Sequence, residues 1–137
     1  MAKLSAKDLE YRHEGNAVSL INFHFVFVPK RRKAVLVKEV ADRTQEIIFD
    51  IAVKNRWRIL SLAIQPDHIH FLVNVKVTDS AASVAHKVKG RLSHDLRIEF
   101  EWLKKLPSTW TPSYFVGSVG NVSTTIVREY IESQTGK

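Results

Sequence analysis

The chain has 137 residues, of which 45% are hydrophobic and 26% charged, a composition that predicts one globular domain over residues 1–137. It contains no cysteine, which excludes disulfides, thiolate zinc sites and cysteine nucleophiles. No stretch approaches the roughly 18 uninterrupted apolar residues that a membrane span needs, and the first ten residues lack the apolar core of a secretory signal. We therefore expect a soluble, cytoplasmic protein with no membrane partner.

The formal net charge is +7 and the pI is near 9.8. An excess of Lys and Arg favours a polyanionic partner such as nucleic acid, because each neutralised phosphate releases condensed counterions. Charge alone does not decide the matter, since many basic proteins of this size bind no nucleic acid. Any metal in this cysteine-free chain must be held by histidine, carboxylate or amide ligands.

A strand is expected over residues 20–28, after an N-terminal arm at residues 1–18. Its side chains alternate, with phenylalanine at every second position from residue 23 to residue 27. Pro29 ends the strand, because proline has no N–H to donate to a sheet ladder. The densest cationic run of the chain follows and is a candidate DNA-binding segment: Lys30, Arg31, Arg32 and Lys33.

Apolar periodicity predicts a helix over residues 37–54 and a longer helix that begins after the cap cluster at residues 78–80. Between them, residues 57–64 and 68–77 are expected to be two strands that pair as a hairpin through a proline-containing turn. The second helix has an apolar stripe from Ala81 to Leu96. Other residues of this helix are cationic and could track DNA phosphates: Lys87, Arg91 and Arg97.

Residues 102–111 are expected to form a loop, followed by a short strand over residues 113–119 and a last helix over about residues 123–134. The predicted order is strand, helix, strand, strand, helix, strand, helix. A βαββαβ series predicts an α+β fold, the ferredoxin-like antiparallel sheet, here with an added C-terminal helix within residues 121–137.

Two histidines lie two residues apart in the strand predicted at residues 68–77. Because side chains alternate along a strand, His68 and His70 project from one face while Ile69 enters the other. Two imidazole nitrogens can then converge on one metal ion. Taken alone, so short a motif is more often a pair of half-exposed histidines at a sheet edge. It needs a partner elsewhere in the chain.

The last predicted helix offers that partner. Tyr130 and Gln134 are four residues apart, so a hydroxyl and an amide carbonyl lie on the same helix face. Tyr130 also falls on the apolar stripe of Ile126, Val127 and Ile131, where a tyrosine packed in the core is the commoner explanation. This segment alone leaves both interpretations open.

Together, these residues offer what metal-assisted phosphoryl transfer requires, an oxygen nucleophile and a cation that polarises the phosphate. A neutral tyrosine is a weak nucleophile, so a nearby cation that favours its ionised form is needed. Two histidines and an amide oxygen leave coordination positions open for phosphate oxygens and water, as a catalytic site does. Tyr130 is therefore the candidate catalytic nucleophile, and the candidate metal ligands are His68, His70 and Gln134.

Four motifs occur along the chain in order: FHFVFVPKRRK, QPDHIHFLV, SYFVGSVG and EYIESQ. Together they resemble the Y1 transposases of the HUH superfamily, in the insertion-sequence group IS200/IS605. The family's histidine pair matches His68 and His70, its nucleophilic tyrosine matches Tyr130, and its helix-borne glutamine ligand matches Gln134. The sequence departs from the family at Gln65, where methionine is usual, and in its uninterrupted basic run.

The resemblance implies a transposase that recognises hairpins at the ends of an insertion sequence and cleaves single-stranded DNA through a 5′-phosphotyrosine. It implies a Mg²⁺ or Mn²⁺ cofactor and a homodimer in which Tyr130 of one subunit serves the histidine pair of the other. Transesterification conserves the phosphodiester energy, and the sequence contains no phosphate-binding loop of the Walker type. No nucleotide cofactor is therefore expected.

Alternative functions remain open at this point. A non-enzymatic binder of single-stranded nucleic acid could use the same fold, and a related HUH nickase, domesticated or replicative, would share the chemistry. A two-histidine phosphoesterase would need two separated His-x-Thr/Ser motifs, which the sequence lacks. His24 is assigned no catalytic role. Asp67, beside the histidine pair, could orient an imidazole, although Pro-Asp is first of all a turn.

Overall fold

The central sheet has four antiparallel strands in the order β4-β5-β3-β6. Their bounds are β3 Ile21–Phe27, β4 Arg58–Gln65, β5 His68–Val75 and β6 Phe115–Ser118. With the intervening helices α1 (Lys38–Asn55) and α2 (Ala81–Glu99), they confirm the predicted α+β fold with a βαββαβ order. The computed structural model describes residues 10–118 and 124–137, with the backbone alone for residues 124–127.

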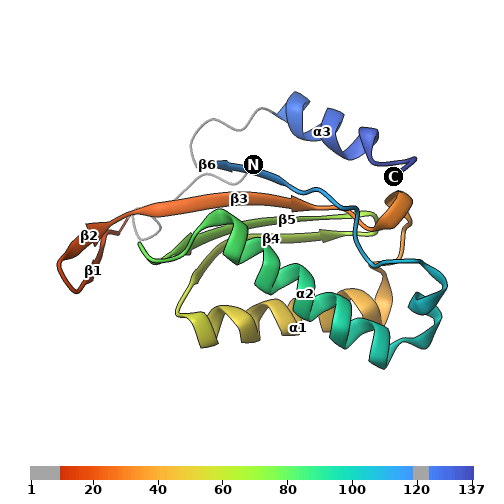
Figure 1. The fold of residues 1–137 in the computed structure, drawn as a ribbon, viewed down its shortest axis with the longest axis horizontal. Coiled ribbons are helices and arrows are strands. Elements are labelled where there is room, and N and C mark those ends of the chain that lie inside the picture. The colour runs from red at the N-terminus through yellow and green to blue at the C-terminus, as the bar shows by residue number, and fades with distance from the viewer. Residues whose placement is uncertain (1–9, 119–123) are drawn as a thin grey trace.

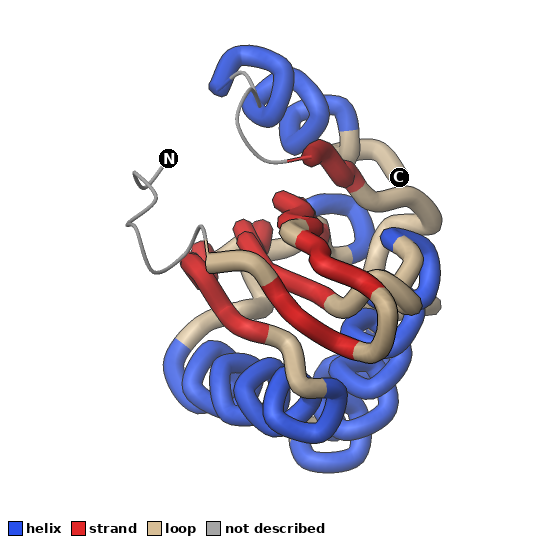
Figure 2. Tube along the Cα trace, turned by 90° about the vertical axis from the view of Figure 1, so that its left-hand side faces the viewer, coloured by secondary structure: helices blue, strands red, loops and turns tan. Residues whose placement is uncertain are grey.

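Helices cover both faces of the sheet. Helices α1 and α2 pack side by side on one face, and α3 (Thr124–Ser133) lies along the opposite face, as Figure 1 and the turned view in Figure 2 show. The sheet is therefore a middle layer whose two faces have different neighbours. The face toward α3 carries the histidine pair.

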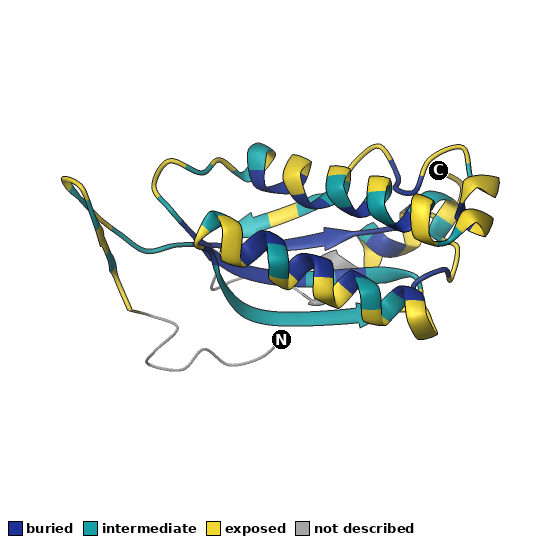
Figure 3. Ribbon diagram, turned by 90° about the horizontal axis from the view of Figure 1, so that it is seen from below, coloured by how far each residue is buried: buried dark blue, intermediate teal, exposed yellow. Residues whose placement is uncertain are grey.

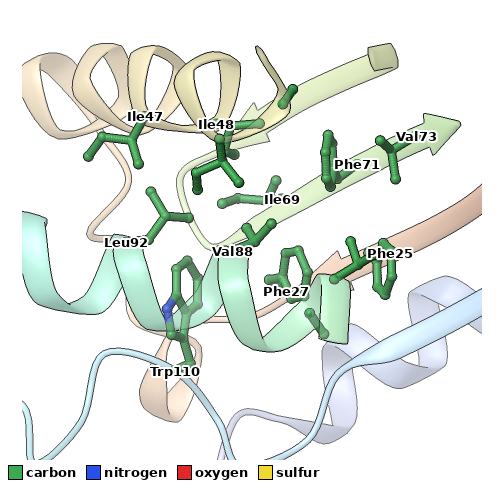
Figure 4. Close-up of a cluster of buried hydrophobic side chains, with 14 of the residues drawn as sticks. Phe25, Phe27, Ile47, Ile48, Ile69, Phe71, Val73, Val88, Leu92 and Trp110 are labelled. Carbon is green, nitrogen blue, oxygen red and sulfur yellow. The ribbon is translucent and has the colours of Figure 1, made fainter. Parts of the chain in front are cut away.

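The main core lies between the sheet and the two longer helices. Phe25, Phe27, Ile69 and Phe71 alternate out of the central strands and are fully buried against isoleucines of α1 and apolar residues of α2 (Figure 4). Burying each such side chain contributes about 1.5–3 kcal/mol relative to exposure. The outward faces of α1 and α2 are exposed in Figure 3, so both helices are amphipathic, as their sequence periodicity predicts.

The two long helices begin and end close to the positions predicted from the sequence. Ser80 caps α2, because its side chain accepts the backbone N–H of Ser83 at 3.0 Å. Arg56 ends α1 in a left-handed conformation, with φ of 58°. No helix within the described residues is both long and apolar enough to cross a membrane.

Three features differ from the sequence predictions. The N-terminal arm contains a small hairpin, β1 (Arg12–Glu14) and β2 (Ala17–Ser19), which turns at Gly15 with φ of 57°. The segment predicted as a loop after α2 includes a 3-10 helix, η3 (Glu101–Lys105). Helix α3 ends at Ser133, so Gln134 lies in the turn that follows the helix.

Candidate active site

The histidine pair occupies the start of β5, on the sheet face away from α1 and α2. Ile69, between the two histidines in sequence, is fully buried in the core on the other face, which confirms the alternation predicted from the sequence. The imidazole rings of His68 and His70 lie 4.8 Å apart between centroids and almost perpendicular to one another. Both side chains are half-buried, so the pair is ordered by its surroundings yet open to a ligand.

His68 is oriented by the turn that precedes it. Its Nδ1 lies 2.8 Å from Oδ1 of Asp67, and because a carboxylate can only accept, Nδ1–H donates to it and fixes the ring. Arg32 donates through Nε to the other carboxylate oxygen at 2.8 Å. Burial opposes ionisation of Asp67, but the hydrogen bonds from His68 and Arg32 outweigh it and lower the Asp67 pKa.

His70 contacts a third histidine, which sequence reasoning left without a role. His24 lies on β3, one diagonal position from His70, because Val26 pairs with His70 and His24 pairs with Leu72. Nε2 of His24 lies 3.2 Å from Nδ1 of His70, and the two ring planes are nearly parallel, at an interplanar angle of 10°. His24 is only 2% exposed.

Burial keeps this part of the site electrically neutral. Desolvation, with a smaller contribution from His68 and His24, lowers the pKa of His70 to about 4. Burial also lowers the pKa of His24. An imidazole that is neutral near pH 7 has a nitrogen lone pair available to bind a metal ion.

Tyr130 lies over the same face of the sheet as the histidines. Its ring packs against Phe115 of β6, with the centroids 6.0 Å apart, and joins a small apolar cluster with Val26 and the buried Ile131. Val26 is also the cross-strand partner of His70. The described residues thus bring Tyr130 and the histidine pair of one chain to the same region of the sheet.

A single serine links the tyrosine to the glutamine. The Ser113 Oγ lies 2.9 Å from the Tyr130 hydroxyl and 3.4 Å from Oε1 of Gln134. Because the carbonyl oxygen of Gln134 can only accept, Ser113 donates to it and receives the hydrogen of Tyr130. Gln134 is 3% exposed, and its amide nitrogen donates to Ser133. The two residues therefore meet the same neighbour, although Gln134 lies just beyond the helix.

The donor set fits a divalent metal that keeps open coordination positions. His68 and His70 each engage a neighbour through Nδ1, and the Gln134 amide lies on the same sheet face. Within the described residues no group of three or more His, Asp or Glu side chains is arranged as a metal cage. Two histidines with an added amide oxygen leave room for phosphate oxygens and water, which a closed structural site does not.

The predicted DNA-binding cations have different surroundings. The basic run winds into a 3-10 turn, η2 (Lys30–Arg32), shortly after β3. Arg31 within this turn and Lys33 just after it are exposed. Arg32 is instead engaged by Asp67. On α2, Arg91 is paired with Asp50 and Asp95. The other two predicted DNA-binding cations of α2 contact uncharged partners: Lys87 reaches Asn55, and Arg97 donates to the Leu106 carbonyl.

A family model for IS200-like transposases matches residues 17–134 of the chain. The chain belongs to that family. It is 29% identical over 132 residues to the ISDra2 transposase TnpA of Deinococcus radiodurans, with 94% of each chain covered. It is also 30% identical over 115 residues to the transposase for insertion sequence element IS200 of Salmonella typhimurium, covering 82% of this chain and 75% of the relative.

Solved structures agree with this family membership. A crystal structure of a candidate transposase from Deinococcus radiodurans superposes with a TM-score of 0.84 at 28% identity, covering 92% of this chain and 99% of the other. A REP-associated tyrosine transposase bound to a REP hairpin shares the fold with a TM-score of 0.58 at 15% identity, covering 88% of this chain and 68% of the other. The chain is thus a transposase of the IS200-like family.

Proposed function

We propose that this transposase cleaves and rejoins single-stranded DNA at the ends of an insertion sequence, with Tyr130 as the nucleophile. The observation that carries the proposal is the placement of Tyr130 and the histidine pair on one sheet face, joined through Val26. A tyrosine that served only to pack the core would not need two imidazoles on the same face of the sheet.

The chemistry is a transesterification in two directions. In cleavage, the Tyr130 oxygen bonds to phosphorus while the bond from phosphorus to the 3′ oxygen breaks, leaving a 5′-phosphotyrosine and a 3′-hydroxyl that takes up a proton. In rejoining, a 3′-hydroxyl attacks the same phosphorus and the tyrosine leaves. The phosphodiester bond energy is conserved, so no nucleotide is consumed.

His68, His70 and Gln134 are the residues that would hold a divalent cation. A cation bound there would polarise the scissile phosphate and stabilise the charge on the tyrosine and the leaving oxygen. Imidazole ligands favour Mn²⁺ over Mg²⁺ in affinity, and abundance in cells favours Mg²⁺. Asp67 and Arg32 support this site by fixing the ring of His68.

The proposed substrate is single-stranded DNA that carries a hairpin. The charge of +7 supports a nucleic-acid partner, and the exposed part of the basic run is Arg31 within η2 and Lys33 just after it. Arg32 also links this run to the histidine pair through Asp67. DNA phosphates bound along the run would thus approach the metal ligands.

We also propose that the active site is shared between two subunits of a homodimer. Within one chain, α3 contacts the sheet through a small apolar cluster and the Ser113 hydrogen bonds. The identical surface exists on a second copy, so the same contacts can form after exchange of the helix. A dimer with two exchanged tyrosines would cut and hold both ends of an element.

The proposed chemistry is tested with single-stranded DNA from the ends of the element that encodes this protein. Incubation with Mg²⁺ or Mn²⁺ should give a covalent complex that survives denaturation and a free 3′-hydroxyl, and chelation should prevent both. Binding of the hairpin without any covalent product would favour a non-enzymatic single-strand binder.

The exchange of α3 is tested by mixing inactive subunits. One variant carries Tyr130→Phe and the other carries both His68→Ala and His70→Ala. When the two are unfolded and refolded together, cleavage should return, because a heterodimer contains one complete site if the tyrosine acts in trans. The matched control joins a wild-type subunit to one carrying all three changes. If only that control cleaves, the tyrosine serves the histidines of its own chain.

A further inference from the structure

The third histidine has no part in the chemistry proposed above, yet it is the most deeply buried of the three. His24 is 2% exposed, and its Nδ1 has no hydrogen-bond partner among the described residues. A buried polar atom without a partner is costly, whereas an apolar side chain of similar shape would avoid that cost. Among the described residues, the polar contact of its side chain is Nε2 to Nδ1 of His70, at 3.2 Å.

This contact restricts the protonation of both rings. If Nε2 of His70 binds a metal ion, that nitrogen carries no hydrogen, so the hydrogen of the neutral ring lies on Nδ1. Nδ1–H then donates to Nε2 of His24, which must be unprotonated. The hydrogen of His24 is thereby placed on its partnerless Nδ1. The tautomer of each ring therefore determines the tautomer of the other.

We propose that His24 is a positioning residue that accepts the Nδ1–H of His70 and so presents Nε2 of His70 to the divalent cation. The inference rests on the proposed function, because it requires His70 to be a ligand. Asp67 does the same for His68. The two ligands are thus fixed by unlike acceptors, a carboxylate and a neutral imidazole.

The surroundings of His24 explain why an imidazole suits this position. Its ring meets that of His70 edge to edge, with the two planes nearly parallel at an interplanar angle of 10°. It also packs in an edge arrangement with Phe115, with the centroids 6.4 Å apart. A carboxylate at the same buried site would be an uncompensated charge, because no cation contacts His24 among the described residues. A neutral acceptor with a flat ring satisfies both the hydrogen bond and the packing.

Mn²⁺ binding to the full-length protein, measured by electron paramagnetic resonance without DNA, tests the proposal. Second-layer partners of metal ligands are worth roughly 10–100-fold in affinity, so His24→Leu should weaken Mn²⁺ binding by a factor in that range. His24→Gln should restore most of the affinity, because its Oε1 can accept the same hydrogen. Thermal unfolding of each variant reports separately on folding.

Asn22→Leu is the matched control. Asn22 is a buried polar residue on the same strand and the same face, two positions from His24, and it accepts a hydrogen bond from Asn74 instead of a metal ligand. The Asn22→Leu substitution should lower the free energy of unfolding and leave the Mn²⁺ affinity unchanged. Equal losses of affinity in Asn22→Leu and His24→Leu would show a general packing effect and overturn the proposal.

A second measurement reads the tautomer directly. Long-range ¹H–¹⁵N correlations of the Mg²⁺-loaded protein should show His70 protonated at Nδ1 in the wild type and in His24→Gln, with this preference lost in His24→Leu. Mn²⁺ affinity that is unchanged in His24→Leu overturns the positioning role alone. If the His68→Ala variant binds Mn²⁺ as tightly as the wild type does, the metal site of the proposed function is overturned as well.

Discussion

The hydroxyl of Tyr130 lies 2.9 Å from the hydroxyl of Ser113. The serine belongs to the segment that leads into β6, and its own hydrogen points to Oε1 of Gln134. One short side chain therefore contacts both the proposed nucleophile and the proposed third ligand. The position of α3 over the sheet depends on this contact as well as on the apolar cluster around Ile131.

Replacing Ser113 by alanine should slow cleavage without abolishing it. A neutral hydrogen bond contributes about 0.5–1.5 kcal/mol, so the single-turnover rate should fall by up to about tenfold. Ser113→Thr keeps the hydroxyl and should stay close to the wild-type rate. Hairpin affinity, measured in parallel, should be unchanged. An alanine variant with the full rate would show that the hydroxyl does not position Tyr130.

Tyr130→Phe should eliminate the covalent DNA complex while hairpin binding is retained. The substitution removes the attacking oxygen and keeps the ring that packs against Phe115. Denaturing gels detect the complex, and gel shifts report binding. Tyr11→Phe is a suitable control, since Tyr11 is 57% exposed and belongs to the N-terminal arm. A covalent product from the Tyr130→Phe protein contradicts the assignment.

Alanine at His68 or His70 should remove metal-dependent cleavage, and Gln134→Ala should reduce it less. An amide oxygen is the weakest of the three donors, and the Gln134 side chain is also held by Ser113 and Ser133. Titration of each variant with Mn²⁺ separates the loss of metal from the loss of rate. Full activity of chelator-treated wild type would exclude a metal at this site.

Acid should destabilise the protein through His70. The pKa of the His70 imidazole is 6.5 in the unfolded chain, and burial lowers it to about 4 in the folded protein. Above pH 6.5 both states are neutral; as the pH falls from 6.5 toward 4, only the unfolded state gains the proton, so the free energy of unfolding decreases. At about 1.4 kcal/mol per pH unit, the loss approaches roughly 3 kcal/mol. Urea unfolding at several pH values measures it, and His70→Ala should show a smaller decrease.

Salt should weaken DNA binding through the exposed part of the basic run. For single strands, the log–log dependence of affinity on salt steepens by about 0.7 for each neutralised phosphate. Substituting the two exposed residues, Arg31 and Lys33, by alanine should flatten it by up to about 1.4. Arg91→Ala should change it less, because Asp50 and Asp95 already engage that guanidinium. Identical slopes for both proteins would assign the run to ordinary solvated surface.

Local patterns predicted most of the fold. Alternation in β3 and β5 and the apolar stripes of α1 and α2 are repeated over many residues, so each element is specified by several independent positions. The hairpin of β1 and β2 was missed because strands of three residues carry almost no periodic signal. It is held by distant contacts, such as the Arg12 guanidinium donating to the carbonyl of Arg56 at 2.7 Å.

The site was predicted less completely than the fold. His68 and His70 stand out because they are two residues apart in one strand, so both side chains project from the same face. Tyr130 stands out because it is four residues from Gln134 along the last predicted helix. The supporting residues do not: the contact of His24 with His70 depends on the register between β3 and β5, and that of Arg32 with Asp67 joins residues 35 apart. Register and tertiary contacts are set by the packed core, which no short motif describes.

The two faces of β5 have different neighbours, and this separates two kinds of mutational effect along a single strand. Substitutions at Ile69, Phe71 and Val73 enter the core with α1 and α2, so they should reduce the amount of folded protein in cells. Substitutions at His68 and His70 leave that core intact and act on DNA processing. A saturation survey of residues 68–71 should therefore alternate, residue by residue, between loss of transposition and loss of abundance. Beyond Phe71 both faces of the strand are buried, so substitutions there should mainly reduce abundance.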